Sequence, residues 1–115
     1  MALSKDEVMT LVKRFVAECA KKHNVKGAYL FGSFAKGTAG EYSDIDLAVI
    51  TGHRRRSEDA LSDEEFEIFH EAQQYDSRLE VVTFTEDGFN RDVCALIRRI
   101  KQEGIPAYAF PGTAS

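Results

Sequence analysis

The stretch of sequence that decides the fold is residues 30–49, LFGSFAKGTAGEYSDIDLAV. Its first residues end a short β-prone run, residues 27–31, which Gly32 stops. Its last residues belong to a second run, residues 43–51, in which apolar side chains recur at every second position. Because the segment between these runs is rich in Gly and Ser, the pattern predicts a strand, a loop and a second strand.

Two capping boxes predict helices on either side of this centre. Ser4 with Glu7 precedes apolar residues at helical spacing, which is typical of an amphipathic helix. Residues 52–62 lack apolar periodicity and contain three consecutive arginines, so we expect an exposed excursion there. Ser62 with Glu65 begins the second expected helix. The residues of that helix expected to face inward are Phe66, Phe69 and Ala72.

The last third of the chain predicts one more strand, residues 78–85, and one more helix, residues 90–103. Gly104 followed by Pro106 is a typical helix stop. The residues of this helix expected to face inward are Val93, Leu96, Ile97 and Ile100. The predicted order is α-β-β-α-β-α, an α/β fold in which helices cover a sheet of three to four strands.

Length and composition describe one small domain, expected over residues 1–108, followed by a disordered tail, residues 109–115. The formal charge of −4 argues against direct binding to a nucleic-acid backbone. No apolar run approaches the length of a membrane span, and residues 1–7 do not resemble a secretory signal. We therefore expect a cytoplasmic protein that binds neither membrane nor nucleic acid.

The two cysteines, Cys19 and Cys94, lie far apart and form no C-x-x-C pair. Each falls in a pattern expected to be helical. We therefore expect two reduced packing residues and no zinc site.

Asp44 and Asp46 are the first candidate functional residues. Residues two apart in a strand project from one face about 6.6 Å apart, so both carboxylates should point one way while Ile45 and Leu47 point the other. Neighbouring carboxylates repel each other and cost stability unless a cation neutralises them. Because hard divalent ions such as Mg²⁺ bind carboxylate oxygens, the pair predicts a metal site.

Gly32 and Ser33 predict a phosphate-binding turn. Gly32 allows a close backbone approach, and residues 33–36 can form one helical turn whose N–H groups attract anionic oxygens. Ser33 adds a hydroxyl donor. Lys36 is either a point charge for the same phosphates or a solvated surface lysine. Carboxylates facing such a turn suggest a nucleoside triphosphate bridged by Mg²⁺.

The spacing of Gly32-Ser33, ten residues and then Asp44-Ile45-Asp46 resembles the signature of the minimal nucleotidyltransferases of the polymerase-β superfamily. The resemblance extends over nearly the whole chain, from the first expected helix to the last. It implies a mixed sheet of three to four strands packed against helices. It also implies Mg²⁺-dependent transfer of a nucleoside monophosphate onto a hydroxyl group.

Members of this family carry a third carboxylate, usually Asp, on the next strand. Glu80 is the one acid inside the strand expected there, since Asp76 precedes that strand and Glu86 and Asp87 follow it. We nominate Glu80, although its side chain is longer than the usual one, and the alternative is an edge-strand charge. The resemblance implies that two Mg²⁺ ions, or Mn²⁺ in their place, are held by Asp44, Asp46 and Glu80. It further implies that Gly32, Ser33 and Lys36 bind the nucleotide and that Glu80 helps to deprotonate the acceptor hydroxyl.

Stand-alone members of the family commonly pair with a small helical HEPN-type protein, as antitoxin and toxin. We therefore expect AMP transfer from ATP to a tyrosine of such a partner, in a type VII toxin–antitoxin pair. A neighbouring reading frame encoding a short helical protein with Arg-x4-His would favour this hypothesis. One alternative is a transferase of a small hydroxyl compound completed by a partner subunit. Another is a non-catalytic, nucleotide-binding antitoxin.

Overall fold

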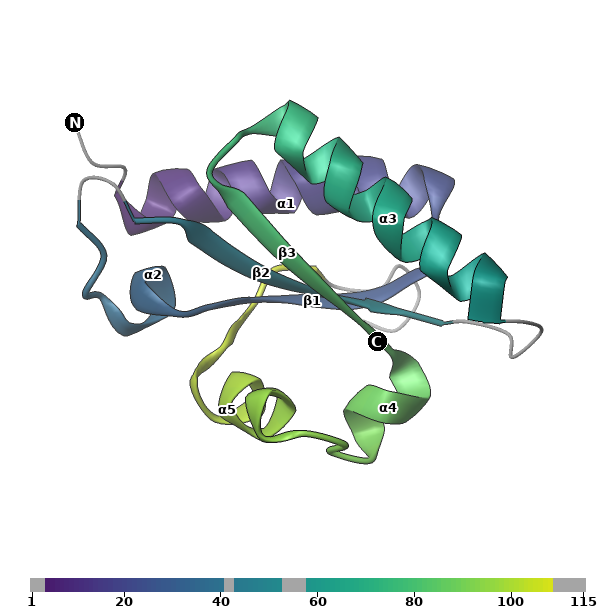
Figure 1. The fold of residues 1–115 in the computed structure, drawn as a ribbon. Helices are drawn as coiled ribbons and strands as arrows, with labels where there is room; N and C mark the ends of the chain where they lie inside the picture. Colours follow the sequence, from purple (N-terminus) through teal and green to yellow (C-terminus); the bar gives the residue numbers. More distant parts are fainter. Residues whose placement is uncertain (1–3, 41–42, 53–57, 109–115) are drawn as a thin grey trace, which may run out of the picture.

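A four-stranded sheet with helices on both faces forms the centre of the fold in the computed structural model, which describes residues 4–40, 43–52 and 58–108 (Figure 1). The elements in chain order are α1 (Lys5–Lys22), β1 (Val25–Phe31), α2 (Ser33–Lys36), β2 (Ile45–Thr51), α3 (Glu58–Tyr75), β3 (Leu79–Thr85), α4 (Glu86–Asn90), α5 (Ala95–Glu103) and β4 (Ile105–Pro106). The expected tail and the run of arginines lie outside the described residues.

The sheet is mixed, with strand order β3-β2-β1-β4. β1 pairs antiparallel with both β2 and β4, whereas β2 and β3 are parallel. A parallel pair needs a crossover connection, and α3 supplies it between β2 and β3. The α/β class and the mixed sheet packed against helices are therefore confirmed. The short β4 is the fourth strand, which the sequence pattern did not locate.

The larger core lies between the sheet and the two long helices, α1 and α3 (Figure 1). The capping box that begins α1 is present, since Ser4 Oγ accepts from Glu7 N and Glu7 Oε1 accepts from Ser4 N. No helix within the described part of the chain is long and apolar enough to cross a membrane. The sheet contributes every second residue of β2, namely Ile45, Leu47 and Val49, all with no exposed surface. Each such side chain stabilises the fold by about 1.5–3 kcal/mol.

The opposite face of the sheet carries a smaller core under α4 and α5 (Figure 1). β2 contributes Ala48 and Ile50 to it, and α5 contributes Ile97 and Ile100. Because β2 alternates strictly between the two cores, its remaining even-numbered residue, Asp46, lies on the α4/α5 side. This alternation decides where the candidate site lies.

α3 differs from the expectation in its start and in its buried face. It begins at Glu58, so Ser62 lies inside the helix and does not begin it, and residues 58–61 are helical where an exposed excursion was expected. Ile68 and Ala72 are fully buried, whereas Phe66 and Phe69 are 68% and 44% exposed. The prediction that both phenylalanines face inward was wrong, because the buried positions form an i, i+4 stripe that neither of them joins.

The helix expected over residues 90–103 begins only at Ala95, as α5, and a further short helix that was not predicted, α4, precedes it. α4 begins after Thr85, whose Oγ1 accepts from Gly88 N at 3.0 Å. Asp92 has a φ of 50° in the turn, a left-handed conformation that interrupts a right-handed helix. Val93 is therefore 63% exposed, contrary to prediction, and Cys94 precedes α5 as an exposed residue instead of a packing residue.

Candidate active site

Asp44 and Asp46 lie at the start of β2, at the edge of the sheet where β1 ends. Asp44 directly precedes the strand and is exposed, and Asp46 is its second residue and is partly buried. Ile45 between them has no exposed surface, because it packs in the larger core. Asp46 therefore faces away from that core, as the strand alternation predicts.

Glu80 lies beside Asp46 on the neighbouring strand. In the parallel register of β2 and β3, the Cα partner of Asp46 is Glu80. Adjacent strands lie about 4.7–4.9 Å apart. Leu79 and Val81 on either side of Glu80 belong to the larger core, so Glu80 faces the same side of the sheet as Asp46 and is exposed there.

The three carboxylates form an acidic cluster with Asp46 at its centre. Burial raises the pKa of Asp46, and the charges of Asp44 and then Glu80 raise it further. A raised carboxylate pKa means that the surroundings disfavour the negative charge. A divalent cation would reverse this penalty, and oxygen-rich carboxylate clusters are the donor set that Mg²⁺ prefers. The residues present thus fit a divalent metal ion.

Gly32 packs against the carboxylate of Asp46. A side chain at this position would have its Cβ in the place that Asp46 Oδ2 occupies. Gly32 also has a φ of 77°, which side chains rarely adopt. Phe31 just before it pairs with Asp46 across β1 and β2. The residue type at position 32 is therefore set by both the backbone conformation and the acidic cluster.

The turn after Gly32 is the short helix α2. Lys36 N donates to Gly32 O at 3.1 Å, and Gly37 ends the helix with a φ of 79°. Ser33 is the first helical residue, directly after the glycine that Asp46 contacts. Lys36 Nζ lies 3.6 Å from Glu103 Oε1 on α5. The structure thus brings Gly32 against Asp46, with Ser33 next along the chain, while Lys36 forms an ion pair with the last residue of α5.

A second charged pair next to the cluster was not found by sequence reasoning. Arg78 precedes β3 and donates to both carboxylate oxygens of Asp76, at 3.1 Å from Nε and 2.9 Å from NH2. The hydrogen bond from the Arg78 side chain is the main cause that lowers the pKa of Asp76. Arg78 O also accepts from Ile45 N at 2.8 Å, which ties the starts of β2 and β3 together. The signal was an Asp-x-Arg triplet at a strand start.

Comparison with known proteins gives one family and several similar folds. A family model described as a nucleotidyltransferase domain matches residues 12–107. A suspected nucleotidyltransferase from Sulfolobus solfataricus has a TM-score of 0.54 at 18% identity, with 89% of this chain and 80% of that chain covered. No curated protein matches the chain significantly in sequence.

Two further similar structures are toxin–antitoxin structures. One contains AMP-PNP and has a TM-score of 0.59 at 20% identity, and the other is a mutant of the MntA–HpeT pair with a TM-score of 0.57 at 16% identity. In both cases 85% of this chain and 73% of that chain are covered. At such identities the similarity shows the fold alone. The family match spans most of the 115 residues, and with it the chain belongs to the nucleotidyltransferase domain family.

Proposed function

We propose that this protein is a Mg²⁺-dependent nucleotidyltransferase that transfers AMP from ATP to a hydroxyl group. The observation that carries the proposal is that Asp44 and Glu80 both lie near enough to Asp46 to raise its pKa, beside the Gly32 turn. These carboxylates would hold two Mg²⁺ ions, with Mn²⁺ as a substitute. Bound there, the ions would neutralise the triphosphate and the charge that develops in an in-line displacement.

The chain's own residues would position the reactants. The backbone at Gly32 approaches the phosphates closely, and the Ser33 hydroxyl donates to a phosphate oxygen. The acceptor oxygen attacks the α-phosphorus, and the bond to pyrophosphate breaks. The proton of the acceptor hydroxyl passes to a carboxylate oxygen of Glu80. The Glu80 side chain is exposed, and in this proposal the acceptor binds on the same side of Asp46 as Glu80. Lys36 binds the outer phosphates only if it leaves Glu103.

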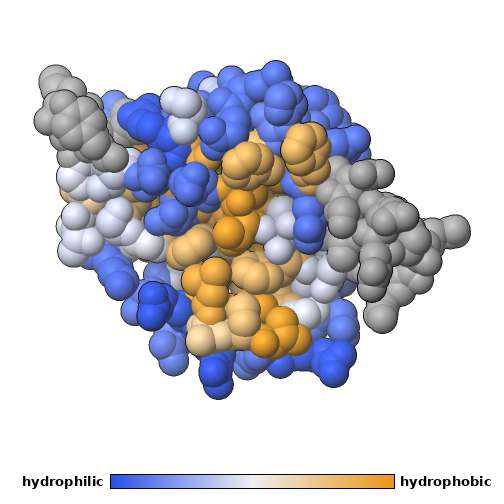
Figure 2. Space-filling view, viewed as in Figure 1, coloured by the Kyte–Doolittle hydropathy of each residue, from blue (hydrophilic) through white to orange (hydrophobic). Residues whose placement is uncertain are grey.

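The proposed acceptor is a tyrosine of a helical HEPN-type partner, with this chain as antitoxin of a type VII pair. Two of the similar structures are toxin–antitoxin structures, one of them with AMP-PNP, an ATP analogue, which supports this choice. The surface also suits a protein partner. Figure 2 shows apolar side chains gathered in a band across the face where β3 lies in front, and β3 is an edge strand of the sheet. Large exposed apolar patches typically mark interaction sites.

The test is to incubate the purified chain with the helical protein encoded beside its gene, ATP and Mg²⁺, and to measure intact masses. We expect the partner to gain the mass of AMP on a tyrosine, and the gain to be absent with the Asp44→Asn, Asp46→Asn double variant. If the complex instead modifies only small hydroxyl compounds, the acceptor assignment is wrong. If the partner is inhibited without any transfer, the chain is a non-catalytic antitoxin.

A further inference from the structure

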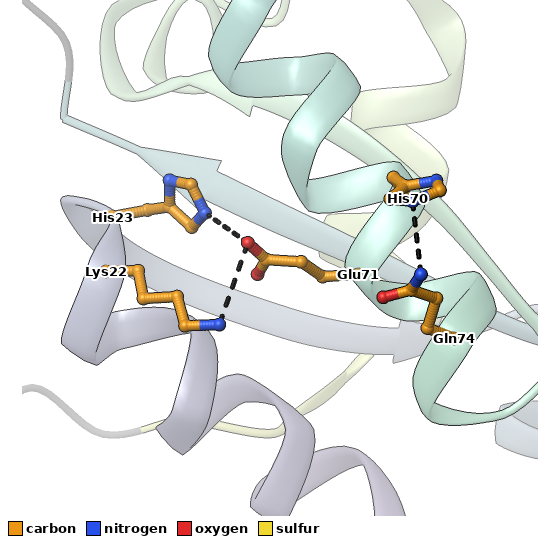
Figure 3. Close-up of polar contacts among 5 residues, drawn as sticks. All are labelled: Lys22, His23, His70, Glu71 and Gln74. Atoms are coloured by element: carbon orange, nitrogen blue, oxygen red, sulfur yellow. Dashed lines mark hydrogen bonds and ion pairs between the residues drawn. The ribbon is translucent and has the colours of Figure 1, made fainter.

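A second group of metal-ligating side chains lies between α1 and α3, on the face of the sheet opposite Asp46 and Glu80. It consists of Cys19, His23 and Glu71, and one ligand atom from each lies within 4.8 Å of the other two. His23 Nε2 is 3.3 Å from Glu71 Oε2 (Figure 3). No zinc site was predicted from the sequence, because Cys19 and Cys94 lie far apart and form no C-x-x-C pair.

The backbone holds this group together. Cys19 lies in the last turn of α1 and His23 is its C-cap, so the two side chains are one helical turn apart. His23 N donates to Cys19 O at 2.9 Å, which fixes the end of the helix. Glu71 comes from α3, where the neighbouring Ala72 is fully buried in the core shared with α1. Two packed helices therefore position the three donors before any ligand binds.

The donor set is that of a borderline-soft metal ion. Zn²⁺ takes thiolate sulfur, imidazole nitrogen and carboxylate oxygen in tetrahedral sites, whereas Mg²⁺ prefers oxygen alone. A Cys19 thiolate and the Glu71 carboxylate together balance the two positive charges of Zn²⁺, and neutral His23 adds a third ligand. The Cys19 residue is 1% exposed and the His23 side chain 5%, so a bound ion would be shielded from most of the solvent.

Room for a fourth ligand lies next to these donors. A groove of about 590 Å³ runs between α1 and α3, and Cys19 and Glu71 line it together with Lys22, Gln74 and Tyr75. Water can reach an ion from this side. Three protein ligands and one water complete a tetrahedral zinc site.

We propose that Cys19, His23 and Glu71 form a zinc site that is separate from the acidic cluster and ties the end of α1 to α3. Binding replaces the thiol hydrogen of Cys19 by a sulfur–zinc bond and releases one proton to solvent. The proposal does not depend on the proposed transferase function. The competing explanation is an ion pair only, because Glu71 Oε2 also lies 3.9 Å from Lys22 Nζ (Figure 3).

The test uses metal-free full-length protein with a non-thiol reductant and an excess of Mg²⁺ to occupy hard oxygen sites. Titration with Zn²⁺ should show one ion per chain and a higher Tm, because a ligand that binds only the folded state stabilises it. Co²⁺ in place of Zn²⁺ should give a sulfur-to-cobalt charge-transfer band. Cys19→Ser and His23→Gln should each weaken binding at least about 10-fold and remove or shift that band, in line with the loss of one ligand.

Matched controls lie close to each ligand. Cys94→Ser removes the other cysteine. His70→Gln removes a histidine adjacent to Glu71 in the sequence; the His70 ring contacts Gln74 and points away from Glu71 (Figure 3). Both controls should bind Zn²⁺ like the parent protein, and so should the Asp44→Asn, Asp46→Asn double variant.

Two results would overturn the zinc site: no Zn²⁺ binding in the presence of Mg²⁺, or binding that survives the Cys19 and His23 substitutions. If Cys19→Ser does not fold, Glu71→Gln replaces it, because the Glu71 side chain is 27% exposed and tolerates change more easily. Unchanged Zn²⁺ affinity in that variant would leave the ion pair as the explanation.

Discussion

The carboxylate of Asp46 occupies the space that a side chain on Gly32 would need. This contact makes the turn after β1 and the acidic start of β2 one packed unit. The two signature elements, twelve residues apart from Gly32 to Asp44 in the sequence, are thereby held against each other. The close approach gives a physical reason for glycine at position 32, beyond its φ of 77°.

Gly32→Ala should therefore destabilise the protein more than Gly37→Ala. Both positions have a positive φ, which costs a non-glycine residue roughly 1–2 kcal/mol. A Cβ at Gly37 meets nothing within 4 Å, whereas at Gly32 it collides with Asp46. Overpacking adds about 1–3 kcal/mol. Chemical denaturation of both variants measures the difference.

The collision has its own control in a double-mutant cycle. Adding Asp46→Ala to the Gly32→Ala background removes the carboxylate, so much of the extra loss should be regained. Equal free energies of unfolding for Gly32→Ala and Gly37→Ala would show that the contact with Asp46 does not affect stability.

The Asp44→Asn, Asp46→Asn double variant should keep its fold and lose the transfer reaction. Removing mutually repelling charges should leave the free energy of unfolding of the metal-free protein unchanged or higher by up to about 2 kcal/mol. Thermal melts in chelator and the transfer assay separate the two effects. A clearly lower Tm in metal-free protein would point to a structural role for these aspartates instead.

The stabilising effect of Asp46→Asn should depend on pH in a defined direction. Burial, Asp44 and Glu80 raise the pKa of Asp46 in the folded state, so the folded protein binds this proton more tightly than the unfolded chain does. Ionised Asp46 therefore destabilises the metal-free fold at neutral pH, and the penalty fades as the pH falls through the raised pKa. The advantage of Asp46→Asn should be largest near pH 7 and shrink in acid. A difference that is constant with pH would contradict this assignment.

Much of the fold was predictable because local signals agreed with the tertiary structure. The Ser4–Glu7 capping box and the alternating strand residues did not depend on distant contacts. The pairing of Asp46 with Glu80 did depend on them. Alternation assigns each residue to a face of the sheet, but the register of β2 and β3 depends on how α3, which connects them along the chain, packs on that sheet.

The wrong predictions have tertiary causes. Phe66 and Phe69 are apolar residues at helical spacing, yet α3 rests on Ile68 and Ala72, and sequence periodicity could not rank the two stripes. The residues between α4 and α5 leave the helical conformation, with a positive φ at Asp92 and an extended backbone at Cys94, although their sequence pattern looks helical. The cluster of Cys19 with Glu71 could not be predicted from the sequence either, because the two residues come from separate helices that meet only in the folded protein.

Nucleotide binding should require a divalent metal ion. The acidic cluster carries three carboxylates, and without a cation it would repel a triphosphate. Calorimetry should detect ATP binding with Mg²⁺ or Mn²⁺ and little or none in excess chelator. Equal ATP affinity under both conditions would mean that the carboxylates take no part in binding.

Glu80→Gln should reduce transfer by orders of magnitude while changing the affinity for ATP and Mg²⁺ only a few-fold, because Asp44 and Asp46 remain to hold the nucleotide-side ion. The matched control is Glu86→Gln, an exposed glutamate at the opposite end of β3, which should transfer at the parent rate. Single-turnover mass measurement with saturating ATP and Mg²⁺ isolates the chemical step. Normal transfer by Glu80→Gln would show that Glu80 is a surface charge without a role in the reaction. The proton acceptor would then have to be sought at Asp44 or Asp46, because both oxygens of Asp76 accept hydrogen bonds from Arg78.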